Sequence, residues 1–219
     1  MPEFDRFASD YKDVLDSSVG SAAYFASGKA EWIARQLGKG FCGSILDFGC
    51  GVGLLADAMA RHLPAARLTG YDVSTDSLAA IPSALRERCN FTSDPAKMGE
   101  GHALAVVSNV LHHIPSGERD QTLAALAKRL APGGKLMIFE HNPINPLTQL
   151  IVARCPFDED AVLLWPREAV ARLRRAGLTV EPPSYVAFFP KPLARLRGLE
   201  AHLGWCPLGA QYVAVGVQP

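Results

Sequence analysis

The sequence lacks an excess of charge of either sign. Lysine and arginine together number 22, as do aspartate and glutamate, so the formal net charge is zero. Proteins that bind nucleic acid or an anionic membrane through their overall field carry a basic excess, and both partners are therefore disfavoured. With 48% hydrophobic and 20% charged residues, the chain has enough apolar side chains to build a core, which excludes disorder as its main state.

Long apolar runs are also lacking, and cysteine is sparse. No run reaches the roughly 18 apolar residues of a membrane span, and the opening residues, MPEFDRFASDYKDVLD, are acidic where a signal peptide is basic and then apolar. We therefore expect a cytoplasmic protein with no membrane span. The five cysteines form no CxxC pair, so we expect reduced thiols, no disulfide and no metal site.

Short apolar runs alternate with helical patterns from about Ile45 onward, which is typical of βαβ units and a mostly parallel sheet. The expected strands are residues 44–48, 67–71, 89–92, 103–108 and 135–140, with a closing pair near the C-terminus. Apolar residues at i, i+3, i+4 and i+7 predict two amphipathic helices, through Leu55, Ala58, Met59 and His62 and through Leu123, Leu126, Ala127 and Leu130. A later helix is expected from Pro166 to a stop at Gly177, and a short amphipathic helix at 193–203.

We expect a single domain over residues 1–219, in four parts. Residues 1–40 are expected to form a helical cap of two helices, and residues 41–142 the α/β core. Residues 143–165 are interrupted by proline and long enough to form a lid. Residues 166–219 supply the closing helices and strands. The arginines at 167–175, with Arg195 and Arg197, are interpreted as a solvated helix face, and attraction of an anionic substrate group is the alternative.

A glycine-rich turn is the most informative motif. Asp47-x-Gly49-x-Gly51-x-Gly53 lies between an expected strand and an expected helix. Glycine lets the backbone turn tightly and a ligand approach closely, and the helix N-terminus supplies unpaired N–H groups. Asp72, at the end of the second strand, is placed to accept both hydroxyls of a ribose, which indicates an adenosine-containing cofactor. The alternative is that Asp72 caps the next helix, a role for which Ser74 is equally suited.

Two features separate the possible cofactors. A buried carboxylate at Asp47 would repel a pyrophosphate and suits a cationic ligand. None of the five tyrosines is followed by lysine four residues later, so the Tyr-x-x-x-Lys pair of small dehydrogenases is missing. A nicotinamide-dependent oxidoreductase, with its cofactor on the same glycine turn, is therefore kept as one alternative function. A catalytically silent protein that keeps the fold as a binding subunit is another.

Five ordered motifs carry a family resemblance. The runs DFGCGVG, GYDVS, SDPAKM, VVSNVLHHIP and LAPGGKLMIFEHN together resemble the class I S-adenosylmethionine-dependent methyltransferases. The resemblance implies an α/β fold with a doubly wound, seven-stranded, mostly parallel sheet in the order 3-2-1-4-5-7-6. It also implies S-adenosyl-L-methionine as cofactor and S-adenosyl-L-homocysteine as product.

The same resemblance implies roles for individual residues. Gly49, Cys50, Gly51 and Gly53 would line the methionine and ribose parts of the cofactor, and Asp47 would order the site near its amino group. Asp72 would hold the ribose hydroxyls and Val73 would pack on adenine. Asp94, with Pro95 beside it, would accept from the adenine amino group, although Asp-Pro also starts ordinary turns. Asn109 would contact the methionine end.

Methyl transfer from a sulfonium is an in-line displacement in which positioning provides most of the catalysis. A base helps when the acceptor is a hydroxyl or a protonated nitrogen, and histidine suits that role. The candidates follow the fourth and fifth strands and are His113, His112, Glu140 and His141. A purely structural role is the alternative for each. The walls of the acceptor site would come from the cap aromatics Phe4, Phe7, Tyr11, Tyr24 and Phe25 and from the lid residues Arg154, Cys155, Phe157, Asp158 and Asp160. Core packing is the alternative for the aromatics and for Cys155.

We therefore predict methyl transfer to a small organic molecule, with O- or N-methylation favoured because candidate bases are present. A nucleic-acid substrate is disfavoured because there is no basic excess and because the fourth strand ends VVSNVLHH, without the Asn-Pro-Pro-Tyr or Asp-Pro-Pro-Tyr signature of amino-directed nucleic-acid enzymes. The protein is expected to be a monomer or a homodimer.

Overall fold

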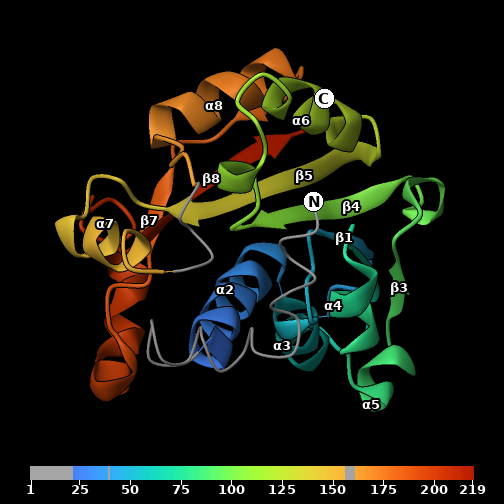
Figure 1. Cartoon of the computed structure of the whole chain (residues 1–219), viewed down its shortest axis with the longest axis horizontal. Coiled ribbons are helices and arrows are strands. Elements are labelled where there is room, and N and C mark those ends of the chain that lie inside the picture. The colour runs from blue at the N-terminus through green and yellow to red at the C-terminus, as the bar shows by residue number, and fades with distance from the viewer. Residues whose placement is uncertain (1–21, 39, 156–160) are drawn as a thin grey trace. The chain divides into compact units, whose positions relative to one another are not determined.

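The computed structural model describes residues 22–38, 40–155 and 161–219, which form an α/β fold with eight strands (Figure 1). The strand order is β3-β2-β1-β4-β5-β8-β6, and β7 also pairs with β8. This order confirms the predicted topology, because the expected sixth strand is divided into β6 (Thr179–Val180) and β7 (Ser184–Val186). Pro182 and Pro183 lie between the two pieces and cannot donate a backbone hydrogen bond to a ladder.

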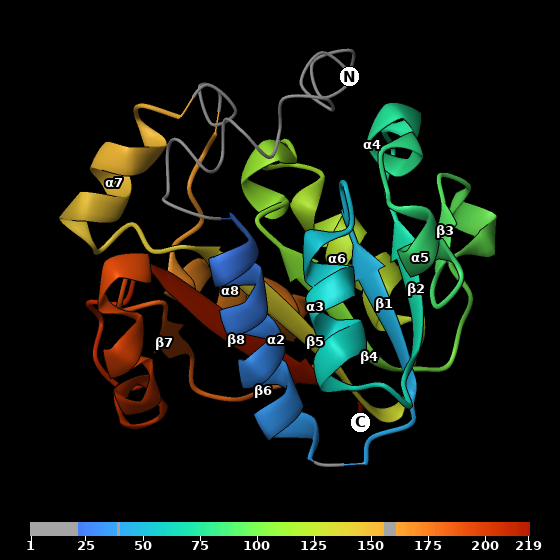
Figure 2. The same cartoon turned by 90° about the horizontal axis from the view of Figure 1, so that it is seen from below.

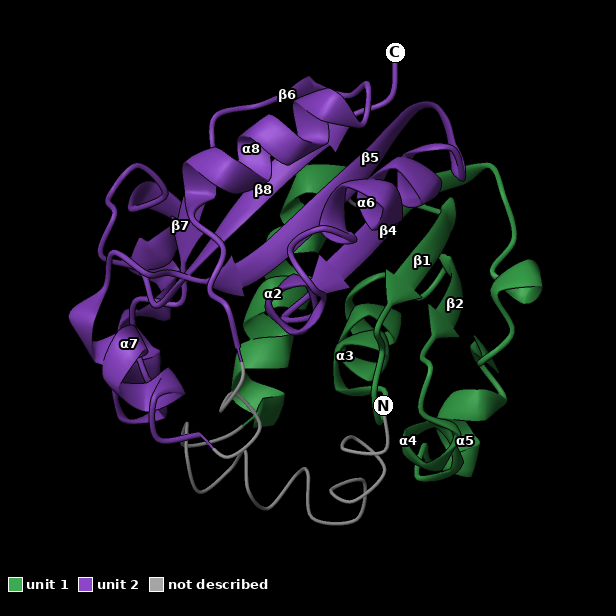
Figure 3. Ribbon diagram, turned by 45° about the horizontal axis from the view of Figure 1, so that its top comes forward, with its two compact units in different colours: residues 1–104 green, residues 105–219 purple. Residues whose placement is uncertain are grey.

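The chain divides into two compact units, residues 1–104 and 105–219, which Figure 3 colours green and purple. In the first unit, β1 (Ser44–Phe48), β2 (Arg67–Tyr71) and β3 (Asn90–Thr92) pair in parallel. Helix α3 (Leu54–His62) follows β1, and α2 (Ala22–Leu37) packs against it. Short helices α4 (Thr75–Ala79) and α5 (Ser83–Arg86) and the 3₁₀ turn η2 (Pro95–Lys97) connect the strands.

The predicted face of α3 is largely correct. Leu55, Ala58 and Met59 are buried, as the spacing predicts, but His62 is exposed at the end of the helix. A terminal polar ring is solvated more cheaply than it is buried. The first of the two predicted cap helices lies outside the described residues, and the second is α2. The predicted division into cap, core, lid and closing segments stays a prediction.

The second unit is built around antiparallel pairing with β8. Strand β4 (His102–Ser108) leads through η3 (Leu111–His113) to α6 (Arg119–Ala127) and β5 (Leu130–His141). Strand β8 (Gln211–Val217) pairs antiparallel with β5, β6 and β7. Helix α8 (Pro166–Arg175) packs on β8 and on α6, while α7 (Pro146–Val152) follows β5 (Figure 1).

Two predicted helices differ from the structure. Leu130 was expected in the last turn of α6 but begins β5, because the helix ends at Ala127 and the chain turns at Gly133 with φ of 73°. The expected amphipathic helix at 193–203 is instead the 3₁₀ helix η5 (Lys191–His202), which is kinked at Leu193. The stop of α8 is confirmed, since Gly177 follows it with φ of 88°.

Within the described residues, the helices are too short or too polar to cross a bilayer.

Candidate functional site

The glycine-rich turn connects β1 to α3 through left-handed backbone. Gly49, Gly51 and Gly53 have φ of 77°, 51° and 82°, a region that favours glycine. The N–H groups of Gly49 and Cys50 donate to the Tyr71 carbonyl at 2.7 and 3.0 Å. A Cβ at Gly51 would meet no atom within 4 Å, whereas one at Gly53 would meet Leu85 Cδ2 at 3.1 Å. Gly51 therefore faces open space, and Gly53 is needed for packing as well as for its backbone angle.

Asp72 is fastened to this turn. Its Oδ2 accepts from Gly51 N at 2.7 Å and its Oδ1 from Ser74 N at 2.9 Å. The cap of α4 is Ser74, whose hydroxyl accepts from Ser77 N at 3.1 Å. The alternative role of Asp72 as that helix cap is therefore wrong. Each carboxylate oxygen keeps a second lone pair for another donor, and Val73 beside it exposes about half of its side chain.

Asp47 is buried as predicted, with 1% of its surface exposed. Its Oδ2 has no hydrogen-bond partner among the described residues. Burial, then the charge of Asp72, raises the pKa of Asp47 to about 7, although the charge of Lys29 on α2 opposes the shift. Such a carboxylate is ready to accept a cationic donor. Lys29 has no motif signal, because a helical lysine usually indicates a solvated face.

Cys50 and Asp94 also lie in the first unit. Burial, together with Asp47 and Asp72, raises the pKa of the Cys50 thiol, so this side chain stays protonated and packs. Asp94 Oδ1 accepts from Ala96 N at 2.9 Å and caps η2, the turn that Pro95 begins. The turn-forming role of Asp94 is thus present, and its predicted contact with adenine stays a prediction.

In the second unit, the end of β5 brings Glu140 to the histidines. Glu140 and His112 are both buried, and Glu140 Oε2 lies 2.5 Å from His112 Nδ1. Glu140 Oε1 accepts from Leu111 N at 2.8 Å. Burial alone would raise the pKa of Glu140, but the charge and hydrogen bond of His112, the charge of His141 and the Leu111 N–H outweigh it and lower the pKa. Glu140 is therefore a carboxylate held in the interior.

The other predicted histidines surround this pair. The His113 and His141 ring centroids lie 4.1 and 5.2 Å from that of His112, and both rings are partly exposed. The structure thus brings together all four predicted catalytic residues, with His112 in the centre. A cluster of imidazoles beside one buried carboxylate can bind or move a proton.

Asn109 and Asn142 both use their side chains for hydrogen bonds within the second unit. Asn109 has φ of 56°, a region that asparagine tolerates, and its Oδ1 accepts from Gln211 Nε2 at 3.0 Å. Asn142 donates to the carbonyls of Pro207 and Gly209 at 2.9 and 2.7 Å. The side chain of Asn142 is therefore occupied by the loop before β8.

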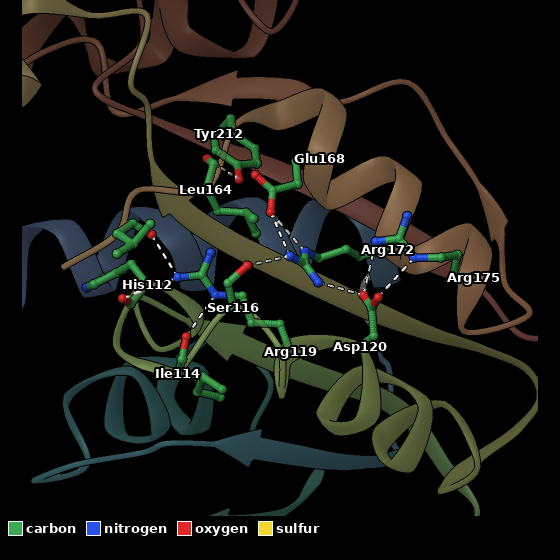
Figure 4. A network of polar contacts seen from close by, with 11 residues as sticks. His112, Ile114, Ser116, Arg119, Asp120, Leu164, Glu168, Arg172, Arg175 and Tyr212 are labelled. Atoms are coloured by element: carbon green, nitrogen blue, oxygen red, sulfur yellow. Dashed lines mark hydrogen bonds and ion pairs between the residues drawn. The ribbon is translucent and has the colours of Figure 1, made fainter.

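Arg119 is a site residue that the sequence did not indicate. Its guanidinium is buried and donates to three carbonyls, Ile114 at 2.9 Å, Val162 at 2.9 Å and His112 at 3.5 Å (Figure 4). Val162 N also donates to the His112 carbonyl at 3.1 Å. Burial lowers the pKa of Arg119, yet arginine stays charged in proteins. Arg119 thus fixes the backbone that carries the histidines to the segment after residue 160.

The arginines of α8 are only partly a solvated face. Arg172 is buried and donates to Glu168, Asp120 and Ser116, so the prediction is wrong for this residue (Figure 4). Arg175 is exposed and pairs with Asp120, and hydrogen bonds from Arg175 and Arg172 lower the pKa of that carboxyl. The partners of Arg172 are Glu168, four residues earlier on α8 itself, and Asp120 on the facing helix α6. The spacing to Glu168 is visible in the sequence, whereas the contact with Asp120 is not.

Several of the residues predicted to line the acceptor site lie outside the part of the chain that the structure describes. Phe4, Phe7, Tyr11, Phe157, Asp158 and Asp160 lie outside the described residues. Cys155 is buried and Arg154 is exposed. Tyr24 and Phe25 on α2 meet edge to face, with ring centroids 5.4 Å apart. Their roles toward an acceptor stay predictions.

Comparison with known proteins points in one direction. A family model described as a methyltransferase domain matches residues 46–136. The ribosomal RNA small subunit methyltransferase C of Pseudomonas aeruginosa is 36% identical over 125 residues, which are 52% of this chain and 37% of that protein. The ubiquinone biosynthesis O-methyltransferase of Aeromonas salmonicida is 27% identical over 179 residues, 74% of each chain. The chain spans about a third of the length of the first two curated relatives it matches.

The fold has counterparts among solved structures. A SAM-dependent methyltransferase from Archaeoglobus fulgidus aligns with a TM-score of 0.70 at 13% identity, covering 95% of this chain and all (100%) of that one. At this identity the likeness concerns the fold.

Proposed function

We propose that this chain, which belongs to the class I S-adenosylmethionine-dependent methyltransferase superfamily, transfers a methyl group from S-adenosylmethionine to a small organic acceptor. O- or N-methylation is favoured. The observation that carries the proposal is the pairing of two carboxylates with the glycine turn: Asp72 fastened to Gly51, and Asp47 buried with one oxygen lacking a partner among the described residues.

The residues present fit this cofactor. Asp47 offers a buried carboxylate to the cationic amino group of the cofactor. A hydrogen bond from that amino group would satisfy Oδ2 of Asp47, which otherwise has no partner among the described residues. Gly51 leaves open space where a side chain would block a ligand. Asp72 keeps lone pairs for two ribose hydroxyls, and the exposed Val73 offers an apolar surface to adenine. The proposed cofactor residues are Asp47, Gly49, Cys50, Gly51, Gly53, Asp72, Val73, Asp94, Pro95 and Asn109.

S-adenosylmethionine, when bound, supplies a methyl group on a sulfonium, so neither a metal nor a covalent enzyme intermediate is required. The protein has to bind the acceptor, orient it and take up a proton. Glu140, held as a carboxylate, fixes the proton of His112 on Nδ1 and so orients the imidazole ring. We assign His112 the role of base, Glu140 that of its positioning partner, and His113 and His141 the role of acceptor contacts.

The class of acceptor rests on charge. A chain with equal numbers of acids and bases lacks the basic field with which proteins attract RNA. The names of the relatives include both an O-methyltransferase and ribosomal RNA methyltransferases. A screen of small hydroxyl and amine acceptors alongside ribosomal RNA, read by mass spectrometry of the products, tests the choice. Methylated RNA without any small product would overturn it.

Cofactor binding is tested separately by calorimetry with S-adenosylhomocysteine. The exchange of Asp72 for alanine removes charge-assisted hydrogen bonds worth about 1.5 to 3 kcal/mol each and should weaken binding tenfold or more. Asp76→Ala, an exposed acid on α4, is the matched control and should bind normally. Thermal stabilisation by NAD(H), with none by S-adenosylhomocysteine, would instead favour an oxidoreductase. Cofactor binding without any methylated product would favour a binding subunit.

A further inference from the structure

The 3₁₀ helix η5 exposes a row of leucines. None of its twelve residues, Lys191–His202, is buried. Leu193, Leu196 and Leu199 are 42–53% exposed and recur every three residues. Side chains three residues apart eclipse one another on a 3₁₀ helix, so Leu196 and Leu199 lie in line, with Leu193 at the kink before them. Core packing therefore does not explain why these positions are apolar.

More large apolar side chains are exposed directly after η5. Trp205 is 78% exposed, and Leu208 is exposed as well. Helix α7 adjoins this loop, because Asn145 Nδ2 donates to the Leu208 carbonyl at 2.7 Å and Thr148 Oγ1 to the Ala210 carbonyl at 3.0 Å. Figures 1 and 2 both show α7 at the same end of the second unit as the orange-red helix that precedes β8. We call Leu193, Leu196, Leu199, Trp205 and Leu208 the leucine face.

Positive charge accompanies this face. Lys191 and Arg195 are exposed, and Arg197 is partly exposed. The one acid of η5, Glu200, turns toward the protein, where its Oε1 accepts from the backbone N–H groups of Phe188 and Phe189 at 3.0 Å each. The outward side of η5 is thus apolar and cationic, in a chain that is neutral overall.

We propose that the leucine face docks on the surface of an anionic lipid bilayer. Interfacial helices bury leucine and tryptophan at the boundary between headgroups and acyl chains, while nearby lysine and arginine are attracted to anionic lipid. Tryptophan is enriched at that depth. A protein partner, or a second copy of the chain, could bury the leucines, but neither explains why cations flank them. Charge complementarity therefore favours lipid.

Vesicle flotation of the full chain tests this. The protein should float with vesicles of phosphatidylcholine plus phosphatidylglycerol, and much less with phosphatidylcholine alone. Each cation near an anionic surface contributes about 1 kcal/mol, so Lys191→Glu with Arg195→Glu should lower partitioning tenfold or more. Lys128→Glu with Arg174→Glu makes the same change of net charge at exposed positions on other helices and should leave most of the binding intact.

The contribution of the leucines is tested by the double variant Leu196→Glu with Leu199→Glu. This variant should no longer float with the vesicles, while its S-adenosylhomocysteine binding and circular dichroism stay as in the parent. Absence of the parent protein from the floating fraction would overturn the proposal. Equal loss in both charge-reversal variants would also overturn it, because general charge would then be the cause. A dimer in size-exclusion chromatography that the leucine variant dissociates, without vesicle binding, would assign the face to a contact between copies.

Discussion

Glu140 Oε2 and His112 Nδ1 are 2.5 Å apart, and both side chains are buried. A hydrogen bond of this kind between a carboxylate and an imidazole fixes which ring nitrogen carries the proton. It also couples the end of β5 to η3, so the orientation of the histidine depends on a residue 28 positions away in the chain.

Glu140→Gln tests that dependence. Glutamine keeps the size and an acceptor for Leu111 N, but it removes the charge that holds the Nδ1 proton. Turnover should fall about 10- to 100-fold, as for other partners that orient a histidine, while the affinity for S-adenosylhomocysteine stays within about twofold. The acid limb of the pH–rate profile should shift, which a purely structural role would not cause. His62→Ala, an exposed histidine on α3, should behave as the parent.

Asp47 predicts a dependence of stability on pH. Its pKa in the folded protein is about 7, against 3.8 for the free group. From about pH 4 to 7 the unfolded chain releases this proton while the folded protein retains it, so the free energy of unfolding falls as the pH rises. Asp47→Asn should remove this fall and be the more stable protein at pH 8, measured by urea unfolding. Asp76→Asn should show the parental slope.

The same carboxylate predicts proton release when a cationic ligand binds. S-adenosylhomocysteine carries an ammonium group, which binds the ionised form of Asp47. Its affinity should therefore increase with increasing pH, by up to about tenfold per pH unit, until the pH reaches about 7. Calorimetry in buffers of different ionisation enthalpy measures the released proton. An affinity that is flat with pH in the parent would contradict the assignment of Asp47 to the amino group.

Gly51 and Gly38 offer a matched pair of substitutions. Both have positive φ, 51° and 84°, and a Cβ at either would meet no atom within 4 Å. Alanine at either position should cost about 1 kcal/mol in stability because of the backbone angle. Only Gly51→Ala should also weaken S-adenosylhomocysteine binding. Equal affinity in the two variants would place the cofactor elsewhere.

Arg119→Met leaves buried carbonyls without their donor. Removing one partner from a buried, charged hydrogen-bond network costs about 3 kcal/mol or more, so the melting temperature should drop clearly. Arg119→Lys should recover part of the loss, since lysine is charged but lacks the planar fork. Arg174→Met, on the exposed side of α8, should be neutral. An Arg119→Met protein as stable as the parent would contradict the structural role assigned to this guanidinium.

The strands of the first unit could be predicted closely because their signals are local. Residues 44–48 and 67–71 match β1 and β2 residue by residue, since apolar runs bounded by glycine and polar turns define them. The glycine turn and the burial of Asp47 could also be predicted from the residues themselves. The strand order could be predicted only through the family resemblance.

What could not be predicted depends on contacts between distant residues. Arg119 and Arg172 look like ordinary helix-surface arginines, and only their partners in space, such as Val162 and Asp120, bury them. Leu130 has helical spacing, but the residues that follow it, from Lys135 onward, pair with β8, so Leu130 belongs to β5. The row of leucines in η5 has an amphipathic pattern without a core to receive it, so periodicity predicted an α-helix.

Strand β8 has a consequence for how the second unit is assembled during synthesis. Its partners β5, β6 and β7 all precede it in the chain, so none of these ladders can close before residues 211–217 have left the ribosome. Strands β1, β2 and β3 have neighbours that are close in sequence and can pair earlier. A nascent chain stalled before β8 should therefore protect β1 to β3 from proteolysis while β6 and β7, which among the described strands pair with β8, are still cleaved.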